Sequence, residues 1–250
     1  MNRSIAALAL ASAAVAGAAL APAHAAPPVS AIAAAIADPL RPAADTARDA
    51  ARKPAEAITF AQVKPGDTVA ELIPGGGYYT RILARAVGPR GHVYALIPEA
   101  FTKRPGALDG INALAAQYGN VTVMPVDLAS FTLPHPANVV WTSENWHDLH
   151  NGPTANPAGV AKAVYAALKP GGVFYLEDHA AAAGAGTTVT STLHRIEPAA
   201  AIAEATAAGF KLEAQGKFLA NPEDTHTAGV RDSGIQGKTD KFALRLRKPR

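Results

Sequence analysis

TVAELIPGGGYYTRILARAVG, residues 68–88, predicts an apolar strand, a glycine-rich turn and an amphipathic helix in immediate succession. Apolar side chains recur at helical spacing after the turn, so this helix would pack back on a sheet. Consecutive glycines let the backbone adopt positive φ and approach a ligand without an intervening Cβ atom. The free N–H groups of a helix that begins behind such a turn favour polar or anionic ligands. With Glu71 at the end of the strand, the stretch predicts a nucleotide-like cofactor site.

Strands and helices alternate along the rest of the chain, which favours an α/β fold with a mostly parallel sheet. The predicted strands are 68–72, 92–97, 121–126, 138–143, 173–177, 210–218 and 241–247, the last two forming a closing hairpin. The other predicted helices are 43–53, 54–63, 108–118, 156–168 and 198–208. Ligands of such sheets lie beyond the carboxyl ends of the strands. Polar residues gather at those ends: Glu71, Asp127, Glu144, Asn145, His147, Asp148, Glu177, Asp178 and His179.

The first 25 residues have the pattern of a secretory signal peptide. Arg3 supplies the positive charge, an Ala/Leu-rich run follows from 5 to 20, and Ala23-His24-Ala25 is a small-x-small cleavage signal. We expect cleavage after Ala25 and export, to the periplasm, without stable membrane insertion; an uncleaved anchor is the alternative. Residues 26–53 are expected to form a linker and a helix, with 26–41 a mobile linker or loosely packed helix. Residues 54–250 form the α/β domain.

Composition excludes several classes of function. The 250 residues include no cysteine, which excludes disulfides, thiolate catalysis and cysteine-ligated zinc. The formal net charge of +3 gives no argument for nucleic-acid binding, so a small-molecule partner is expected. The sequence does not specify an oligomeric state.

The organisation from about residue 54 onward resembles the class I S-adenosylmethionine-dependent methyltransferases. The resemblance rests on Glu71 with the glycines, Asp127 after the third strand, LKPGG at 168–172 and the closing hairpin. More narrowly, the chain is similar to exported predicted methyltransferases that share PGGGYYT (74–80), an LHRI-type segment (193–196) and a GKTDKF-type end (237–242). The resemblance implies a Rossmann-like fold with a seven-stranded sheet and helices on both faces.

The resemblance also implies S-adenosylmethionine as cofactor. Its methionine part would be held at the glycine turn, by Glu71, Pro74, Gly75, Gly76 and Gly77, with Tyr79 as a further lining residue. Asp127 would face the adenine amino group. Tyr78 and Tyr79 either line this site or pack the turn.

Two family positions differ here. Ile73 replaces the first glycine of the family motif, and Ile97 replaces the acid that holds both ribose hydroxyls. Losing charge-assisted hydrogen bonds at the ribose would cost roughly 1.5–3 kcal/mol of binding free energy. Glu99 would take over this role if Pro98 turned the chain back. A nicotinamide-dinucleotide site is less well matched, because the third glycine of its GxGxxG pattern falls on Thr80.

The segment SENWHDLHN, residues 143–151, would face the acceptor in such an enzyme. The candidate catalytic residues are His147, Asp148 and Glu144, with Asn145 beside them. An imidazole titrates near neutrality and suits a general base, so His147 would be the base, oriented by Asp148 or Glu144. Trp146 would stack on cofactor or substrate. The alternative is a loop whose polar groups bond the backbone.

Two more clusters have competing interpretations. One hypothesis is a zinc or iron(II) site formed by His147, Asp148, His150, Asp178 and His179. The spacing of these residues is not a strong metal signature. His194 and Arg195 would bind an anion, or else cap locally with an ion pair to Glu197. The long polar loop 220–238 would form a lid.

Three hypotheses follow. The first is methyl transfer from S-adenosylmethionine to a small acceptor. The second is a non-catalytic protein that binds a small ligand on the same fold. The third is a metal-dependent enzyme that uses the cluster around His147, His150 and His179.

Overall fold

The computed structural model describes residue 1 and residues 28–250. Apart from Met1, the predicted signal peptide therefore lies outside the described residues. Within the described part of the chain, none of the helices combines the length and apolarity needed to cross a bilayer.

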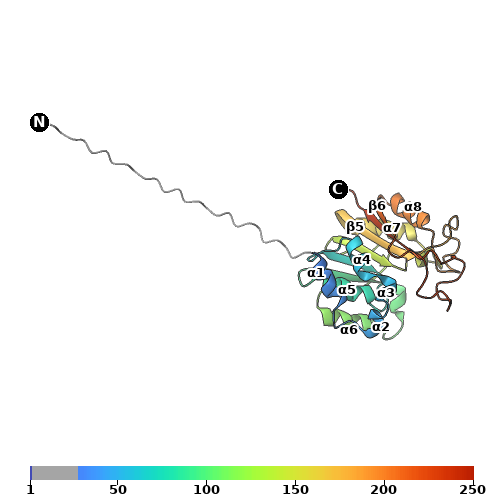
Figure 1. Cartoon of the computed structure of the whole chain (residues 1–250), viewed down its shortest axis with the longest axis horizontal. Coiled ribbons are helices and arrows are strands. Elements are labelled where there is room, and N and C mark those ends of the chain that lie inside the picture. The colour runs from blue at the N-terminus through green and yellow to red at the C-terminus, as the bar shows by residue number, and fades with distance from the viewer. Residues whose placement is uncertain (2–27) are drawn as a thin grey trace.

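Seven strands form one sheet in the order β3-β2-β1-β4-β5-β7-β6. Figure 1 shows this sheet among the helices. They are β1 (Thr68–Leu72), β2 (His92–Pro98), β3 (Val121–Val126), β4 (Ala137–Ser143), β5 (Leu168–His179), β6 (Lys211–Gly216) and β7 (Lys241–Arg247). The first five strands are parallel, and β7 runs antiparallel to both β5 and β6. The prediction of a mostly parallel sheet that ends in an antiparallel pair is confirmed. The strand order reverses between β1 and β4, which is where such sheets bind ligands.

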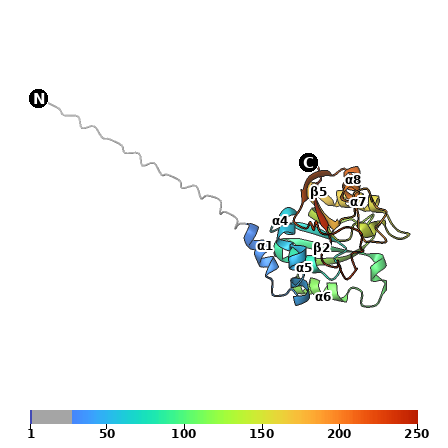
Figure 2. The ribbon, with the colours of Figure 1, turned by 45° about the vertical axis from the view of Figure 1, so that its right-hand side comes forward.

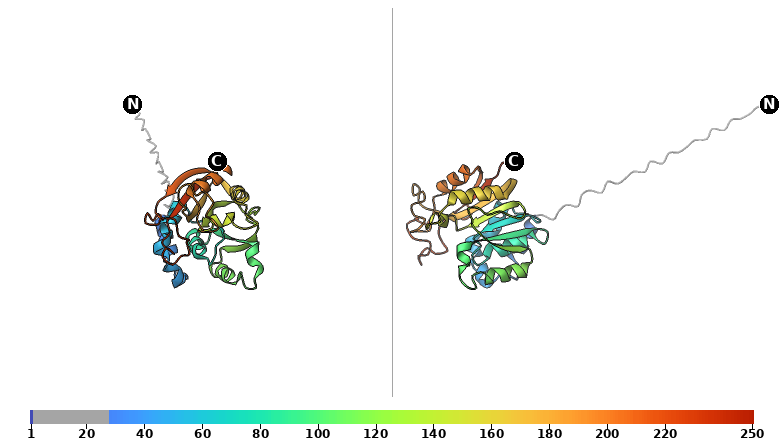
Figure 3. Two further views of the ribbon diagram at one scale, coloured as in Figure 1. Left: turned by 90° about the vertical axis from the view of Figure 1, so that its right-hand side faces the viewer. Right: turned by 180° about the vertical axis from the view of Figure 1, so that it is seen from behind.

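Helices cover both faces of the sheet, as Figures 2 and 3 show. The helices are α1 (Pro28–Ile36), α2 (Ala43–Thr46), α3 (Asp49–Arg52), α4 (Pro54–Phe60), α5 (Tyr78–Val87), α6 (Asp109–Tyr118), α7 (Pro157–Ala167) and α8 (Pro198–Ala207), with the 3₁₀ turns η1 (Glu99–Lys103) and η2 (His147–His150). One core cluster joins α1, α4, α5 and α6 to the sheet, and the other joins α7 and α8 to it.

The central strands β1, β2 and β4 are mostly apolar because both of their faces are buried. In β1, Val69 belongs to one core cluster while Ala70 and Leu72 belong to the other. Glu71 is the polar exception in this strand, and it is buried at the carboxyl end.

The segment before residue 54 is more ordered than the sequence indicated. Residues 28–36 form helix α1, which packs on α5 and α4 and buries Ile32 and Ala35. The single helix predicted for 43–53 is two short helices, α2 and α3, separated by a turn at residues 47 and 48. Each helix has its own ion pair: Asp45 of α2 pairs with Arg81, and Asp49 of α3 pairs with Arg41.

Strand boundaries differ from prediction mainly at β5. The sequence predicts a strand that begins at residue 173, after a helix that extends to 168, but β5 already begins at Leu168. A register shift between Ala137 and Val139 of β4 accommodates the irregular start, and Gly171 adopts φ +77°. β6 is shorter than predicted, whereas β3 has the predicted bounds.

Candidate functional site

The glycine turn lies between β1 and α5, at the carboxyl edge of the sheet. Gly75 and Gly77 have φ of +56° and +82°, a region that other residues enter only with strain. A Cβ atom on Gly77 would lie 2.4 Å from Cδ1 of Leu114, so α6 approaches the backbone closely there. A Cβ atom on Gly75 or Gly76 would meet nothing within 4 Å. The first two glycines therefore present open backbone, and the third fixes the helix start.

Glu71 is buried directly behind this turn. Its carboxylate accepts a hydrogen bond from the hydroxyl of Thr80 at 2.6 Å. Burial raises the pKa of Glu71 to about 7. The turn itself is braced by Arg81, which donates to the carbonyl of Gly76 at 2.8 Å and pairs with Asp45 at 3.0 Å.

A cavity of about 170 Å³ opens between the glycine turn and the short helices α2 and α3. It is lined by Asp45, Arg48, Arg52, Glu71, Leu72, Ile73, Pro74, Gly75, Gly76, Tyr78, Tyr79, Ser143, Glu144 and Asn145. Both tyrosines line it and also pack: Tyr78 donates to Asp49 at 2.6 Å, and the Tyr79 ring lies 4.7 Å from that of Trp141. The structure thus brings the predicted cofactor residues together, except Gly77 and Asp127.

A second cavity, of about 410 Å³, adjoins the first and shares Arg48, Arg52 and Glu144 with it. The rest of its lining is Ala51, His147, Asp148, His179, His194, Val230, Arg231, Gln236, Gly237, Thr239 and Lys241. Residues of the predicted lid, 220–238, supply part of this wall.

Glu144 does not orient His147, contrary to the prediction. Its carboxylate pairs with Arg52 of α3 and with Lys241 of β7, the latter at 2.9 Å. Burial would raise the pKa of Glu144, but the two cations outweigh burial and hold it well below the usual range. Glu144 also has φ +58°, a strained backbone of the kind found at functional sites.

Asp178 is the residue that orients His147. The fully buried Asp178 accepts hydrogen bonds from both the main-chain N–H and Nδ1 of His147, each at 2.7 Å. Nε2 of His147 lies 3.3 Å from Oδ1 of Asp148. Burial would lower the pKa of His147, but Asp148 and Asp178 outweigh burial and raise it to about 10. In this arrangement the imidazole is protonated at neutral pH, and it must lose that proton before it accepts another.

The predicted metal set does not converge as a whole. His150 lies 3.3 Å from Glu204, and Asp178 lies behind His147. Nδ1 of His179 forms a hydrogen bond of 2.8 Å with the hydroxyl of Thr239. Burial lowers the pKa of His179 to about 4.

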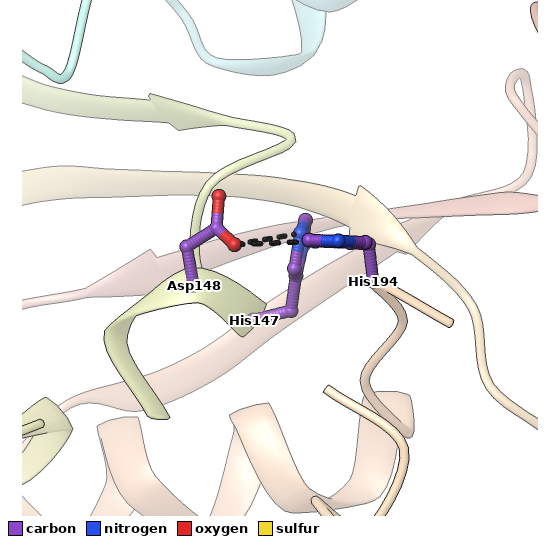
Figure 4. Close-up of side chains that lie close together, drawn as sticks. All are labelled: His147, Asp148 and His194. Carbon is purple, nitrogen blue, oxygen red and sulfur yellow. Dashed lines mark ion pairs between the residues drawn. The ribbon is translucent and has the colours of Figure 1, made fainter. Parts of the chain in front are cut away.

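His194, which the sequence associated with an anion, lies beside His147 and Asp148 instead (Figure 4). Its neighbour Arg195 is fully buried and pairs with Asp224 at 2.8 Å, so neither the predicted anion nor Glu197 is its partner. Glu197 accepts from the main chain of Gly186 instead.

Trp146 is likewise buried, with its indole N–H donating to Glu204 at 2.7 Å. It therefore lies in the core and lines neither of the two cavities described above.

A third cavity follows the carboxyl ends of β2 and β3, where the resemblance places adenine. Asp127 and Glu99 both line it, together with Phe101 and Leu128. Asp127 also accepts from the N–H of Ala129 at 3.0 Å and from the hydroxyl of Ser130 at 2.9 Å, which lowers the pKa of Asp127. Ile97 lines a neighbouring cavity with the glycine turn and offers no polar atom there.

Comparisons with known proteins agree with this architecture. No protein-family model matches the chain. Over 72 residues it is 39% identical to protein-L-isoaspartate O-methyltransferase of Ignicoccus hospitalis, a match that covers 28% of this chain and 32% of that protein. The chain thus matches only about a third of the length of this curated relative.

Solved structures match over most of the chain. An S-adenosylmethionine-dependent methyltransferase from Aquifex aeolicus has a TM-score of 0.55 and 15% identity, covering 77% of this chain and 88% of that one. The glycopeptide N-methyltransferase MtfA, solved with S-adenosylmethionine, has a TM-score of 0.54 and 19% identity, covering 78% and 86%. The cyclase SpnF has a TM-score of 0.57 and 15% identity, covering 89% and 93%. The fold is therefore the Rossmann-like fold of class I methyltransferases.

Proposed function

We propose that the chain transfers a methyl group from S-adenosylmethionine to a small acceptor. The observation that carries the proposal is that two cavities share one wall, formed by Arg48, Arg52 and Glu144. The first cavity contains the glycine turn and Glu71, and the second contains His147. A methyl donor in the first and an acceptor in the second would meet at this wall.

The glycine turn fits the cofactor. Gly75 and Gly76 leave open space where other residues would place a Cβ atom, and the Glu71 carboxylate lies buried beside them. The donor's α-ammonium group would neutralise that carboxylate. When bound, S-adenosylmethionine supplies an electrophilic methyl group, so the chain's own residues have only to position the acceptor and exclude water.

Glu99 is the residue we assign to the ribose in place of Ile97. It starts η1, is exposed, and lines the same cavity as Asp127. Replacing Glu99 with glutamine should weaken cofactor binding about tenfold, since one charge-assisted hydrogen bond is worth at least 1.5 kcal/mol.

The acceptor we propose is a small anion that is methylated on oxygen. Four cationic side chains line the second cavity, Arg48, Arg52, Arg231 and Lys241, against the two carboxylates of Glu144 and Asp148. The curated relative is named an O-methyltransferase, which agrees with this choice of atom. His147 lines this cavity and is the residue we place next to the reacting oxygen.

Calorimetric titration with S-adenosylmethionine and S-adenosylhomocysteine tests the proposal directly. We expect micromolar binding of both, weakened at least tenfold in Glu71→Ala and unchanged in Glu56→Ala, which removes an exposed acid on α4. An absence of binding by the unmodified protein at millimolar ligand would refute the proposed cofactor.

A non-catalytic ligand-binding protein is the second candidate function, favoured by the apolar Ile97 at the ribose position. It predicts binding without turnover. Release of S-adenosylhomocysteine in the presence of candidate anionic acceptors separates the two functions. We also propose that the chain acts outside the cytoplasm, because residues 1–25 have the pattern of a signal peptide.

A further inference from the structure

Three side chains of the metal-binding kind meet in the second cavity, away from the glycine turn. His147 and Asp148 belong to η2, and His194 comes from the loop that precedes α8 (Figure 4). One nitrogen or oxygen atom of each lies within 4.8 Å of the other two. All three residues line the cavity, so a bound ion would be accessible from it.

The spacing between these atoms suits a shared metal ion better than direct hydrogen bonds. Oδ1 of Asp148 lies 3.3 Å from Nε2 of His147 and 3.4 Å from Nδ1 of His194. A charge-assisted N–H···O bond is about 2.7–2.9 Å long, as the 2.7 Å bond between His147 and Asp178 is. Metal bonds of about 2.0–2.1 Å at tetrahedral angles place ligand atoms roughly 3.3–3.4 Å apart.

His194 provides an independent observation. Its Nδ1 atom is buried, and its 3.4 Å contact with Oδ1 of Asp148 lacks the geometry of a hydrogen bond. A buried polar atom without a partner costs free energy, so native structures rarely leave one unexplained. A metal ion bound next to Asp148 would supply the missing partner.

The hydrogen bonds from His147 to Asp178 are of the kind found at metal sites. Asp178 accepts hydrogen bonds from both the main-chain N–H and Nδ1 of His147, which leaves Nε2 next to Asp148. A metal ion that binds Nε2 would displace the proton that this nitrogen carries at neutral pH. A carboxylate bonded to the second nitrogen fixes the tautomer of a ligating imidazole and increases its basicity.

We propose that Nε2 of His147, Oδ1 of Asp148 and Nδ1 of His194 bind one divalent transition-metal ion. Two imidazoles and one carboxylate suit zinc, with cobalt(II) as its spectroscopic substitute. Three protein ligands leave a further position open, and it faces the cavity. Its exchangeable ligand is an oxygen of a small anion, attracted by the nearby Arg231 and Lys241.

The metal site does not depend on the proposed methyl transfer. It lies in the second cavity, whereas the cofactor would bind at the glycine turn. If both hold, His147 acts on the acceptor through the metal and is no longer a free base. Metal binding measured without S-adenosylmethionine keeps the two questions separate.

Titration of the metal-stripped full-length protein with Co²⁺, followed by visible absorption, tests this site. We expect ligand-field bands that saturate at one ion per chain and disappear when Zn²⁺ is added. His194→Ala should weaken Co²⁺ binding about 100-fold or more, and Asp178→Asn about 10- to 100-fold. His226→Ala is the matched control, because this histidine pairs with Asp240 at 2.9 Å and does not line the cavity.

Circular dichroism melting shows whether each variant is folded. Absence of Co²⁺ bands in the unmodified protein overturns the proposal whatever the variants do. So does binding of unchanged strength and spectrum in folded His194→Ala.

Discussion

At the scale of single residues, burial and ligand binding have opposite effects on the protonation of Glu71. Its carboxylate is buried, and among the described residues only the Thr80 hydroxyl donates a hydrogen bond to it, so burial raises its pKa from 4.5 to about 7. Burial favours the neutral acid, whereas a cationic ligand would favour the carboxylate. The protonation state of this one residue therefore couples ligand binding to pH.

The first prediction concerns stability. Because the folded-state pKa of Glu71 is raised, its protonated form stabilises the fold, and this contribution is lost as pH rises from about 4.5 to about 7. The shift corresponds to roughly 3 kcal/mol at most. Glu71→Gln should remove this part of the pH dependence. Urea unfolding of both proteins at several pH values measures it, and parallel pH profiles would contradict the assignment.

The second prediction is that the affinity for S-adenosylmethionine rises with pH, whereas the stability contribution of Glu71 falls. A cationic α-ammonium group pairs with the ionised Glu71, so affinity should rise about tenfold from pH 6 to pH 8. Glu71→Gln should bind more weakly, with a flat pH profile. Calorimetry in buffers of different ionisation enthalpy would also detect the released proton. A steep profile that persists in Glu71→Gln would point to another residue.

The third prediction separates two neighbouring glycines. Gly77→Ala places a methyl group 2.4 Å from Leu114 in a backbone with φ +82°, which should cost roughly 2–4 kcal/mol of folding free energy. Gly76→Ala meets open space and should change stability by less than about 0.5 kcal/mol. Its methyl group should instead weaken cofactor binding. Denaturant unfolding and calorimetry on both variants test this, and equal stability losses would be the contrary result.

At the scale of elements, α2 and α3 close the first cavity over the glycine turn. Asp49 of α3 pairs with the buried Arg41 and accepts a hydrogen bond from the Tyr78 hydroxyl of α5, whereas Asp45 of α2 pairs separately with Arg81. The guanidinium of Arg52 lies 4.7 Å from the centre of the Tyr78 ring. The contacts of Asp49 lie at one point, so a substitution there should loosen α3.

The fourth prediction is that Asp49→Ala makes this segment open more often. Losing two hydrogen-bonded partners should cost about 2 kcal/mol locally, which raises the open population about 30-fold. Trypsin cleavage after Arg48 and Arg52 should accelerate by a similar factor. Glu56→Ala serves as the control on the adjacent helix. Unchanged cleavage would mean that the anchor lies elsewhere.

The elements differ in how far the sequence predicts them. β1, the glycine turn and α5 carry short-range signals, and their prediction is confirmed. α1 was underestimated because its alanine-rich sequence shows little contrast between its buried and exposed faces. Asp178 was predicted to lie near His147, because the two residues follow neighbouring strands. His194 meets His147 and Asp148 only through the tertiary structure, and it has a left-handed backbone that its sequence does not signal. Arg52 and Lys241 were missed for the same reason, since nothing near them in sequence points to Glu144.

At the scale of the whole molecule, the fold has no cysteine to stabilise it, and its two core clusters cover both faces of one sheet. Disulfides therefore contribute nothing to its stability, which rests on packing, hydrogen bonds and ion pairs. Its melting temperature should therefore not change when reductant is added.

The fifth prediction is that the mature protein begins at Ala26. Expression of the full chain in a Gram-negative host, followed by intact-mass measurement of the periplasmic fraction, checks both cleavage and location. Replacing Ala25 with a bulky residue should block cleavage. Recovery of the full-length mass only from the cytoplasm would refute export.

Glu144 also has a consequence for how the protein is made. Its two partners are Arg52, before the first strand, and Lys241, on the last strand in sequence. Contacts between such distant segments form late in folding, because a long loop must close first. A chain released before β7 is synthesised lacks one partner of Glu144 and the strand next to β5. Ligand binding at this wall would therefore report that synthesis has reached the final strand, and premature termination products would be inert as well as unstable.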